Sequence, residues 1–311
     1  MKKDSKIFVA GHKGLVGSAL VQQLTRLGYE NIITVNRELL DLTRQSEVEE
    51  FFDSCKPDYV FLAAAKVGGI NYNKTYPADF IHDNIYITTN VIAASHKVGV
   101  KKLLNLGSVC IYPKITPQPI KEEYLLTSPL EPTNEAYSIA KIIGLKMCQF
   151  YHKQYGFNAI SLMPSNLYGP NDNFNVEQCH VIPGMINKFI TSKETGDPVV
   201  LWGDGSPTRQ FMYSEDIADA CIFLMKTYDS PEIINVSNED EYTIKNLSEI
   251  ISSKLGYTGE IIWDTTKPNG SPKRKVCTQK LYDMGWRPKV SMEEGLEKTI
   301  EWFMNNRRQF K

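Results

Sequence analysis

Long apolar runs are missing from this chain of 311 residues. Its continuous stretches of hydrophobic side chains fall well short of the ~20 residues needed to cross a bilayer. Near the N-terminus, Met1 to Lys6 is followed by only four apolar residues before Gly11, too few for the apolar centre of a secretion signal. These two absences predict a cytoplasmic protein with no membrane partner.

An excess of positive charge is also missing. The chain has 35 lysines and arginines against 36 aspartates and glutamates, for a formal net charge of -1. A protein that binds a nucleic acid backbone normally carries a basic excess. We therefore expect no nucleic acid partner.

The cysteines lack the spacing of metal ligands or of paired redox thiols. No CxxC pair occurs, and the six cysteines stand singly at positions 55, 110, 148, 179, 221 and 277. An isolated cysteine most often acts as a small hydrophobic residue. The sequence therefore predicts reduced thiols and no metal site, while Cys110 and Cys179 need separate consideration.

Short apolar runs alternate with helical patterns through the first half of the chain. We predict strands at residues 6–10, 31–35, 58–65, 101–107 and 158–163, and helices at 15–28, 46–55, 77–98 and 135–155. This alternation indicates an α/β protein with a Rossmann-type, doubly wound parallel sheet. Ligands of such sheets bind beyond the carboxyl ends of the strands.

The pattern changes after residue 164, where loop chemistry introduces a smaller, interleaved C-terminal α/β unit. In this part we predict strands at 199–202, 209–213 and 233–236, and helices at 183–192, 214–228, 243–256 and 291–304. Thr243 and Ser291 are expected to cap the last two helices. The 214–228 helix and the 233–236 strand should return to the first sheet.

A glycine-rich turn joins the first predicted strand to the first predicted helix. It reads Gly11, His12, Lys13, Gly14, Leu15, Val16, Gly17. Backbone N–H groups and the helix N-terminus can face the pyrophosphate of a dinucleotide at such a turn. The GxxGxxG spacing alone is weak evidence, because glycine clusters also form ordinary turns, but its place between a strand and a helix strengthens the interpretation.

A cation stands where NAD-binding proteins usually carry an acid. The second predicted strand ends in Val35, Asn36 and Arg37, and Lys13 offers another positive charge. Two cations suit a ribose 2′-phosphate, so NADP(H) is favoured over NAD(H); the alternative is two ordinary surface cations. Further candidate cofactor-binding residues are Asp41, Leu42, Ala63, Ala64 and Ala65, the alanines being small enough for a dinucleotide to approach the backbone.

A tyrosine and a lysine on one helical face form a candidate proton-transfer site. Tyr137 and Lys141 have YxxxK spacing, and Ser108 follows the 101–107 strand at the sheet edge that carries the glycine turn. We expect Lys141 to lower the pKa of Tyr137 and to hold the nicotinamide ribose, with Ser108 donating a hydrogen bond to a substrate carbonyl. The alternative, a surface tyrosine beside a helix lysine, leaves the accompanying serine and glycine turn unexplained.

Longer motifs resemble those of the GDP-L-fucose synthase family, within the extended short-chain dehydrogenase/reductase superfamily. They are the glycine turn and residues 63–69 (AAAKVGG), 110–113 (CIYP), 130–135 (LEPTNE), 164–170 (PSNLYGP) and 180–183 (HVIP). The resemblance covers almost the whole chain. It implies a GDP-4-keto-6-deoxy-D-mannose substrate, epimerised at C3 and C5 and then reduced at C4 by NADPH.

The resemblance also implies roles for particular residues. Cys110 and His180 would be the acid and base of epimerisation, although from the residues alone they read as a strand-edge hydrophobe and a loop histidine. Cys179 would be structural. The implied cofactor-binding set adds Pro164, Ser165, Asn166, Leu167 and His180, and the implied substrate-binding set is Lys188, Trp202, Arg209 and Arg274.

The change of pattern after residue 164 predicts a domain division, and the resemblance implies a homodimer. Residues 1–167 and 210–239 would form the NADP(H)-binding domain, and residues 168–209 and 240–311 the nucleotide-sugar-binding domain. The helices at 77–98 and 135–155 would build a four-helix bundle between two subunits.

Three departures from the family pattern leave the substrate open. Val109, Lys13 and Cys277 stand where relatives often have a hydroxyl residue, an arginine and an aspartate. One alternative is a reductase-only enzyme that acts on a related GDP-4-keto hexose or heptose, with epimerisation by a separate protein. A non-catalytic NADP(H)-binding module could lose Ser108, Tyr137 or Lys141, yet all three are present. An NAD-retaining UDP-sugar 4-epimerase does not suit Arg37 and Lys13.

Overall fold

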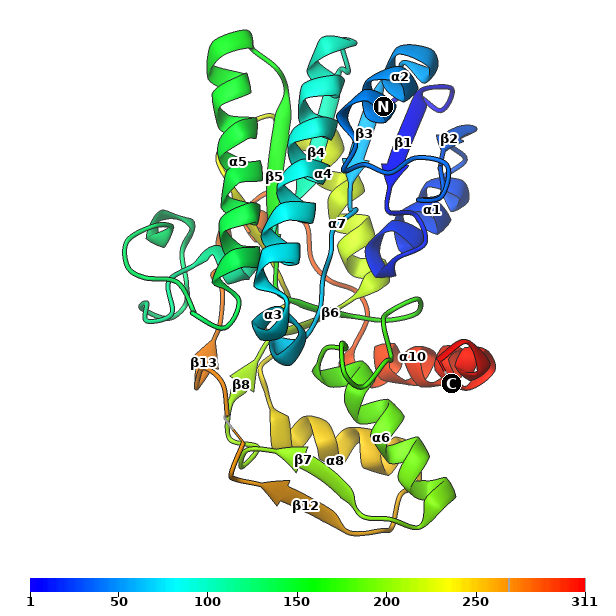
Figure 1. Ribbon diagram of the computed structural model, residues 1–311, viewed down its shortest axis with the longest axis vertical. Helices are drawn as coiled ribbons and strands as arrows, with labels where there is room; N and C mark the ends of the chain where they lie inside the picture. Colours follow the sequence, from blue (N-terminus) through cyan, green and yellow to red (C-terminus); the bar gives the residue numbers. More distant parts are fainter. Residues whose placement is uncertain (268, 311) are drawn as a thin grey trace.

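A six-stranded parallel sheet forms the core of the computed structural model, which describes residues 1–267 and 269–310 (Figure 1). Every neighbouring pair of its strands is parallel. Across the sheet the strands run β2 (Asn31–Ile33), β1 (Lys6–Ala10), β3 (Tyr59–Leu62), β4 (Lys102–Leu106), β5 (Ala159–Pro164) and β10 (Ile234–Val236). The predicted doubly wound α/β fold is confirmed.

Helices cover both faces of this sheet because its strands alternate their side chains between two cores. Ile7 and Val9 of β1 face a core with α1 and α7, whereas Phe8 and Ala10 face a core with α2 and α4. The bounds of these helices are α1 (Leu15–Arg26), α2 (Gln45–Cys55), α4 (Pro77–Lys97) and α7 (Ser214–Thr227). Helix α5 (Glu135–Tyr155) packs along α4 (Figure 1).

The strand register places the carboxyl ends of the central strands at one edge. Ala10 pairs with Leu62, and Leu106 pairs with Leu162. The residues that follow these strands, including Gly11, Ala63 and Gly107, therefore leave the sheet on the same side. This edge faces the second, smaller part of the molecule (Figure 1).

The smaller part has its own hydrophobic core. Phe189, Leu247 and Leu296 lie fully buried in it, contributed by three different helices. These helices are α6 (Val181–Thr195), α8 (Ile244–Lys254) and α10 (Met292–Asn306), and β7 (Val199–Trp202) pairs with β12 (Ile261–Asp264) beside them. Residues 268 and 311, which fall within the predicted 240–311 segment, lie outside the described residues.

Two predicted helix caps are confirmed. The Thr243 hydroxyl accepts a hydrogen bond from Asn246 N at 2.9 Å, and the Ser291 hydroxyl accepts one from Glu294 N at 3.2 Å. Each cap satisfies one N–H group that has no partner inside its helix.

The predicted strand at 209–213 is wrong, because Gln210 divides it. This buried side chain donates to Asn238 O at 2.7 Å and accepts from Val276 N at 2.8 Å. The divided segment gives β8 (Thr208–Arg209) in a sheet with β11 (Tyr242–Thr243) and β13 (Lys273–Arg274), and β9 (Phe211–Tyr213) beside β6 (Asn166–Tyr168).

Several short elements carry no clear sequence signal. They are the helices α3 (Ile70–Thr75) and α9 (Gln279–Asp283) and the 3-10 turns η1 (Val109–Ile111), η2 (Glu122–Tyr124) and η3 (Arg307–Phe310). Within residues 1–267 and 269–310, no helix has both the length and the apolar character required to cross a bilayer.

Candidate active site

Two glycines of the glycine turn lie too close to neighbouring backbone atoms to carry a side chain. Gly11 has a φ of +85°, and a Cβ there would lie 2.8 Å from Ala64 Cα. A Cβ on Gly17 would lie 2.0 Å from Gly11 O. Glycine is therefore required at both positions, which lets the turn sit directly against the end of β3.

The same turn fits a dinucleotide pyrophosphate. Gly14 precedes α1 in an extended conformation, and no side chain caps the helix. The first N–H groups of a helix have no partner within it, so those of α1 are available to an anion. Lys13 is exposed next to them.

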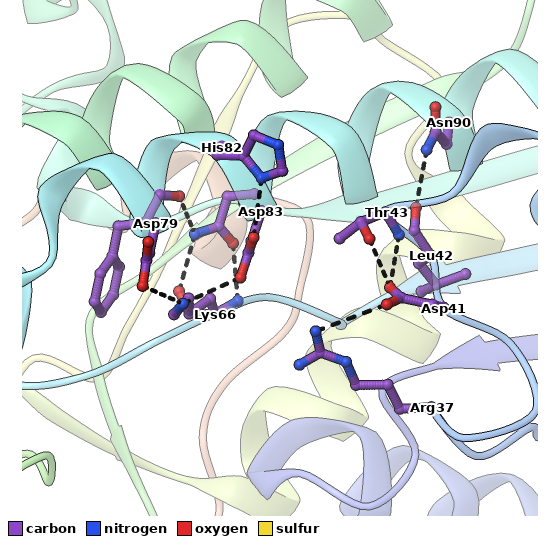
Figure 2. Close-up of polar contacts among 11 residues, drawn as sticks. Arg37, Asp41, Leu42, Thr43, Lys66, Asp79, His82, Asp83 and Asn90 are labelled. Atoms are coloured by element: carbon purple, nitrogen blue, oxygen red, sulfur yellow. Dashed lines mark hydrogen bonds and ion pairs between the residues drawn. The ribbon is translucent and has the colours of Figure 1, made fainter.

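Arg37 lies in a loop together with two other predicted cofactor residues (Figure 2). Its side chain is 75% exposed, with Nη2 3.9 Å from Asp41 Oδ2. Asp41 in turn accepts hydrogen bonds from Thr43 N and Oγ1, while Asn90 donates to Leu42 O at 3.0 Å. These bonds fix the loop backbone and leave the guanidinium open to a phosphate.

Ser108, Tyr137 and Lys141 meet at the carboxyl end of β4. The Ser108 hydroxyl accepts a hydrogen bond from Cys110 N at 3.2 Å, and Ser108 also forms a side-chain hydrogen bond with Tyr137. The Lys141 side-chain nitrogen lies over the Tyr137 ring, 5.6 Å from its centre. The structure thus brings together the three residues predicted to act on the carbonyl.

The expected effect of Lys141 on Tyr137 is wrong for this structure. Burial raises the pKa of Tyr137, and the hydrogen bond with Ser108 offsets this only in part. Burial also lowers the pKa of Lys141 to about 8. The physical reason is that burial outweighs the lysine, whose nitrogen lies 5.6 Å from the ring centre and donates its hydrogen bond to Leu106 O at 2.8 Å.

Cys110 lies between this group and two arginines. Arg209 and Arg274 are register partners on the parallel strands β8 and β13, and Arg274 donates to Val109 O at 2.8 Å. Burial and the neighbouring Arg274 lower the pKa of Arg209 to about 10. Both arginines and Tyr137 lie within electrostatic range of Cys110. One site therefore holds proton-transfer groups and a pair of cations.

His180 immediately precedes α6 and is its N-cap residue. Part of the residue is exposed, and the protein atoms around the imidazole lower its pKa. A lowered pKa leaves the ring neutral at physiological pH, the form that accepts a proton.

The other predicted substrate residues lie on α6 and β7. Lys188 donates to Val200 O at 2.8 Å, and burial lowers its pKa. Trp202, at the end of β7, is 48% exposed, with the Lys267 nitrogen over its ring. The contacts of Lys188 and Trp202 are with Val200 and Lys267, in the smaller part of the molecule, and not with Arg209 or Arg274.

The predicted cofactor segment after β5 is anchored on both sides. Ser165 accepts a hydrogen bond from the Ser237 hydroxyl at 2.7 Å. Asn166 donates to Gln210 O at 2.9 Å. Pro164 ends β5, and Leu167 lies in β6, so this segment leads from the sheet edge into the smaller part.

One buried acid near the site was not predicted. Asp172 is 8% exposed, and its Oδ2 has no hydrogen-bond partner among the described residues. Burial raises its pKa to about 7, and its charge acts on Cys179, next to His180. An aspartate in a polar loop gives no sequence signal for such burial. Among the residues that the structure describes, no group of histidine, cysteine and acidic side chains is arranged to hold a metal ion.

A glycine turn between a strand and a helix, with a serine, a tyrosine and a lysine at the same sheet edge, defines a dinucleotide-dependent enzyme of the short-chain dehydrogenase kind. Residues 7–237 match the family described as "NAD dependent epimerase/dehydratase family". The chain belongs to that family.

Individual relatives are similar over nearly the whole length. A protein named putative GDP-L-fucose synthase 2, from Arabidopsis thaliana, is 54% identical over 307 residues, covering 98% of this chain and 94% of the relative. The solved NADP-bound GDP-L-fucose synthetase from Naegleria fowleri has a TM-score of 0.93 at 30% identity, covering 100% and 96% of the two chains. The predicted resemblance to GDP-L-fucose synthases is confirmed.

A second kind of relative is also similar in structure. An NADP-bound GDP-mannoheptose C4 reductase from Campylobacter jejuni has a TM-score of 0.91 at 35% identity, and the match covers 98% of this chain and 99% of the other.

Proposed function

We propose that the protein converts GDP-4-keto-6-deoxy-D-mannose to GDP-L-fucose, by epimerisation at C3 and C5 and NADPH-dependent reduction at C4. The observation that carries the proposal is the meeting of Ser108, Tyr137 and Cys110 with the paired arginines Arg209 and Arg274. The similarity to GDP-L-fucose synthases supports the choice of sugar.

Epimerisation requires a base and an acid near the two carbons that flank the ketone. The C4 carbonyl acidifies the protons on C3 and C5, so each proton can be removed to leave an enolate. A neutral His180 accepts a proton from one face, and the Cys110 thiol returns one to the opposite face. After one inversion the imidazole holds an extra proton and the thiol has lost one, so exchange with solvent must restore both groups before the second centre is inverted. Over the full cycle there is no net change in protons or electrons.

Reduction at C4 requires a proton for the carbonyl oxygen. Bound NADPH supplies the hydride. A tyrosine phenol is protonated at neutral pH, so Tyr137 can donate this proton, although the burial that raises its pKa makes it a weaker acid. Ser108 donates a hydrogen bond to the same oxygen, which stabilises the negative charge that develops on it.

Cations at two places would hold the ligands. Arg209, Arg274 and Lys188 would bind the diphosphate or the sugar of the substrate, and Trp202 would lie beside its nucleotide. The glycine turn with Lys13 and Arg37 would hold NADP(H), as would Asp41, Leu42, the alanines 63–65, Lys141, His180 and residues 164–167.

Hydrogen exchange tests the epimerase half of the proposal. The protein is incubated with GDP-4-keto-6-deoxy-D-mannose in deuterated water without NADPH, and deuterium at C3 and C5 is measured by NMR. We expect exchange at both carbons, with a loss in Cys110→Ser and His180→Asn. Absence of exchange in the unaltered protein would instead support the reductase-only alternative, which the similarity to a GDP-mannoheptose C4 reductase favours.

We also propose a homodimer that forms through α4 and α5. Both helices expose large apolar side chains, with Tyr86 46%, Phe150 62% and Tyr155 53% exposed. Light scattering on the purified protein should give the mass of two chains, and Phe150→Glu should shift it toward one. A single-chain mass for the unaltered protein would contradict the proposal. A cytoplasmic location stays a prediction from the sequence.

A further inference from the structure

The segment of residues 66–69 that follows the cofactor alanines is anchored to α4 at its start. Asn84 of α4, 1% exposed, binds the Lys66 backbone in both directions: its Oδ1 accepts from Lys66 N, and its Nδ2 donates to Lys66 O, each at 2.9 Å. The same Nδ2 donates to Phe80 O at 2.8 Å. A paired amide of this kind fixes both the place and the orientation of the segment.

The side chain of Lys66 adds a second anchor to α4 (Figure 2). Its nitrogen lies 3.2 Å from Asp79 Oδ2 and 3.1 Å from Asp83 Oδ2. Burial on its own would lower the pKa of Lys66, yet the hydrogen bonds to the two carboxylates raise it. The lysine therefore stays charged, and the anchor persists across the physiological pH range.

The other end of the segment packs closely against the loop that precedes His180. Gly69 N donates to Gln178 O at 2.7 Å. A Cβ on Gly69 would lie 2.4 Å from Cys179 O, so any larger residue would displace that peptide. Asn73, on α3, holds the glycines in place by donating to Gly68 O and Gly69 O.

We infer that the 66–69 segment positions His180, with Gly69 and Asn84 as positioning residues. Gly69 contacts the backbone of residues 178 and 179, directly before His180. Through Lys66, the same segment is bound to Asn84 of α4. This inference rests on the proposed role of His180 as a base of epimerisation. It explains why two glycines stand where the chain must approach another loop closely.

The test begins with Gly69→Ala, because the added Cβ would collide with Cys179 O, next to His180. Asn84 is less suitable, since it also binds Phe80, whose ring packs on Tyr137. Displacement of a catalytic group by about 1 Å can cost 10²-fold in rate. We expect deuterium exchange at C3 and C5 to fall by about tenfold or more. Affinity for NADPH should fall much less than the exchange rate, since the glycine turn and Arg37 are unchanged and His180 is only one of the residues that would hold the cofactor.

A double variant separates positioning from general damage. If Gly69 acts through His180, Gly69→Ala combined with His180→Asn exchanges no more slowly than His180→Asn alone. Losses that multiply in the double variant, or wild-type exchange in Gly69→Ala, would overturn the inference. Asn84→Ala should also slow exchange, because it releases the start of the segment from α4. Asn71→Ala, an exposed change on the neighbouring α3, is the matched control and should leave exchange unaltered.

A second readout does not depend on activity. The pKa of His180 is lowered by its surroundings. Side-chain NMR should show that pKa moving toward the ordinary value in Gly69→Ala and staying where it is in Asn71→Ala. An unmoved His180 would overturn the inference. If the unaltered protein shows no exchange at all, the proposed epimerase activity fails, and this titration still decides whether Gly69 positions the imidazole.

Discussion

The Lys141 side-chain nitrogen lies 5.6 Å from the centre of the Tyr137 ring and donates a 2.8 Å hydrogen bond to the Leu106 carbonyl. In this arrangement the lysine nitrogen lies over the face of the ring, and the phenol is protonated at neutral pH. A tyrosine that is protonated before the reaction suits the donation of a proton to a carbonyl oxygen, which reduction at C4 requires.

Tyr137→Phe should therefore impair reduction and spare binding. The ring and its contacts remain, but the donated proton is lost, so the rate of NADPH oxidation with substrate should fall by ~10²-fold or more. Fluorescence titration should show NADPH affinity within about twofold of the unaltered protein. Tyr257→Phe, whose hydroxyl donates only to exposed Glu260 O, is the control. Near-normal turnover of Tyr137→Phe would remove the phenol from the mechanism.

Arg37→Ala should separate the two nicotinamide cofactors. The 75% exposed guanidinium can pair with a 2′-phosphate that only NADPH carries. We expect the dissociation constant for NADPH to rise by about tenfold or more and that for NADH by about twofold or less. Arg44→Ala, a 69% exposed arginine that pairs with Glu47, provides the control. An equal loss for both cofactors would place the 2′-phosphate elsewhere.

Asp172 should make stability fall as pH rises. Its folded pKa, about 7, lies above the value of ~3.9 for an unfolded aspartate, so the folded state binds the proton more tightly. The stabilisation is complete below about pH 4 and is lost as pH rises toward 7. Each pKa unit corresponds to about 1.4 kcal/mol, so the full effect is on the order of a few kcal/mol.

Asp172→Asn removes that titration. Urea unfolding of both proteins between pH 4 and pH 8 should show the variant gaining stability relative to the unaltered chain as pH rises. A stability difference that does not change with pH would mean that Asp172 keeps an ordinary pKa.

Ser291→Ala should destabilise the smaller part of the molecule. Its hydroxyl accepts from Glu294 N and caps α10, whose Leu296 and Phe303 are fully buried. Loss of such a cap costs about 1 kcal/mol in the free energy of unfolding, measurable by urea titration. Ser291→Asp restores an acceptor and should recover most of the loss; equal destabilisation by both changes would argue against a capping role.

Local patterns in the sequence predicted much of the fold. The apolar run of β1 and the glycine turn after it are both short-range signals, as are the caps Thr243 and Ser291. The strand predicted at 209–213 failed because its break depends on Gln210, whose partners at 238 and 276 are distant in sequence. A local pattern carries no information about such partners.

The site shows the same division. Ser108 and Tyr137 could be predicted to meet, since Ser108 follows β4 and Tyr137 lies in the first turn of α5, the helix that leads from the same sheet edge back to β5. The resemblance alone pointed to Arg209 and Arg274, which turn out to be register partners on adjacent strands. Gly69 contacts Gln178, and Asp172 is buried, where segments distant in the sequence pack together. The neighbouring residues in the sequence therefore predict neither feature.

The most direct test of the account is the structure of the product that forms from GDP-4-keto-6-deoxy-D-mannose and NADPH, determined by NMR. GDP-L-fucose, with inverted C3 and C5 and a hydroxyl at C4, is the predicted result. A C4-reduced sugar that keeps the original configuration at C3 and C5, or a ketone left unreduced, would contradict it.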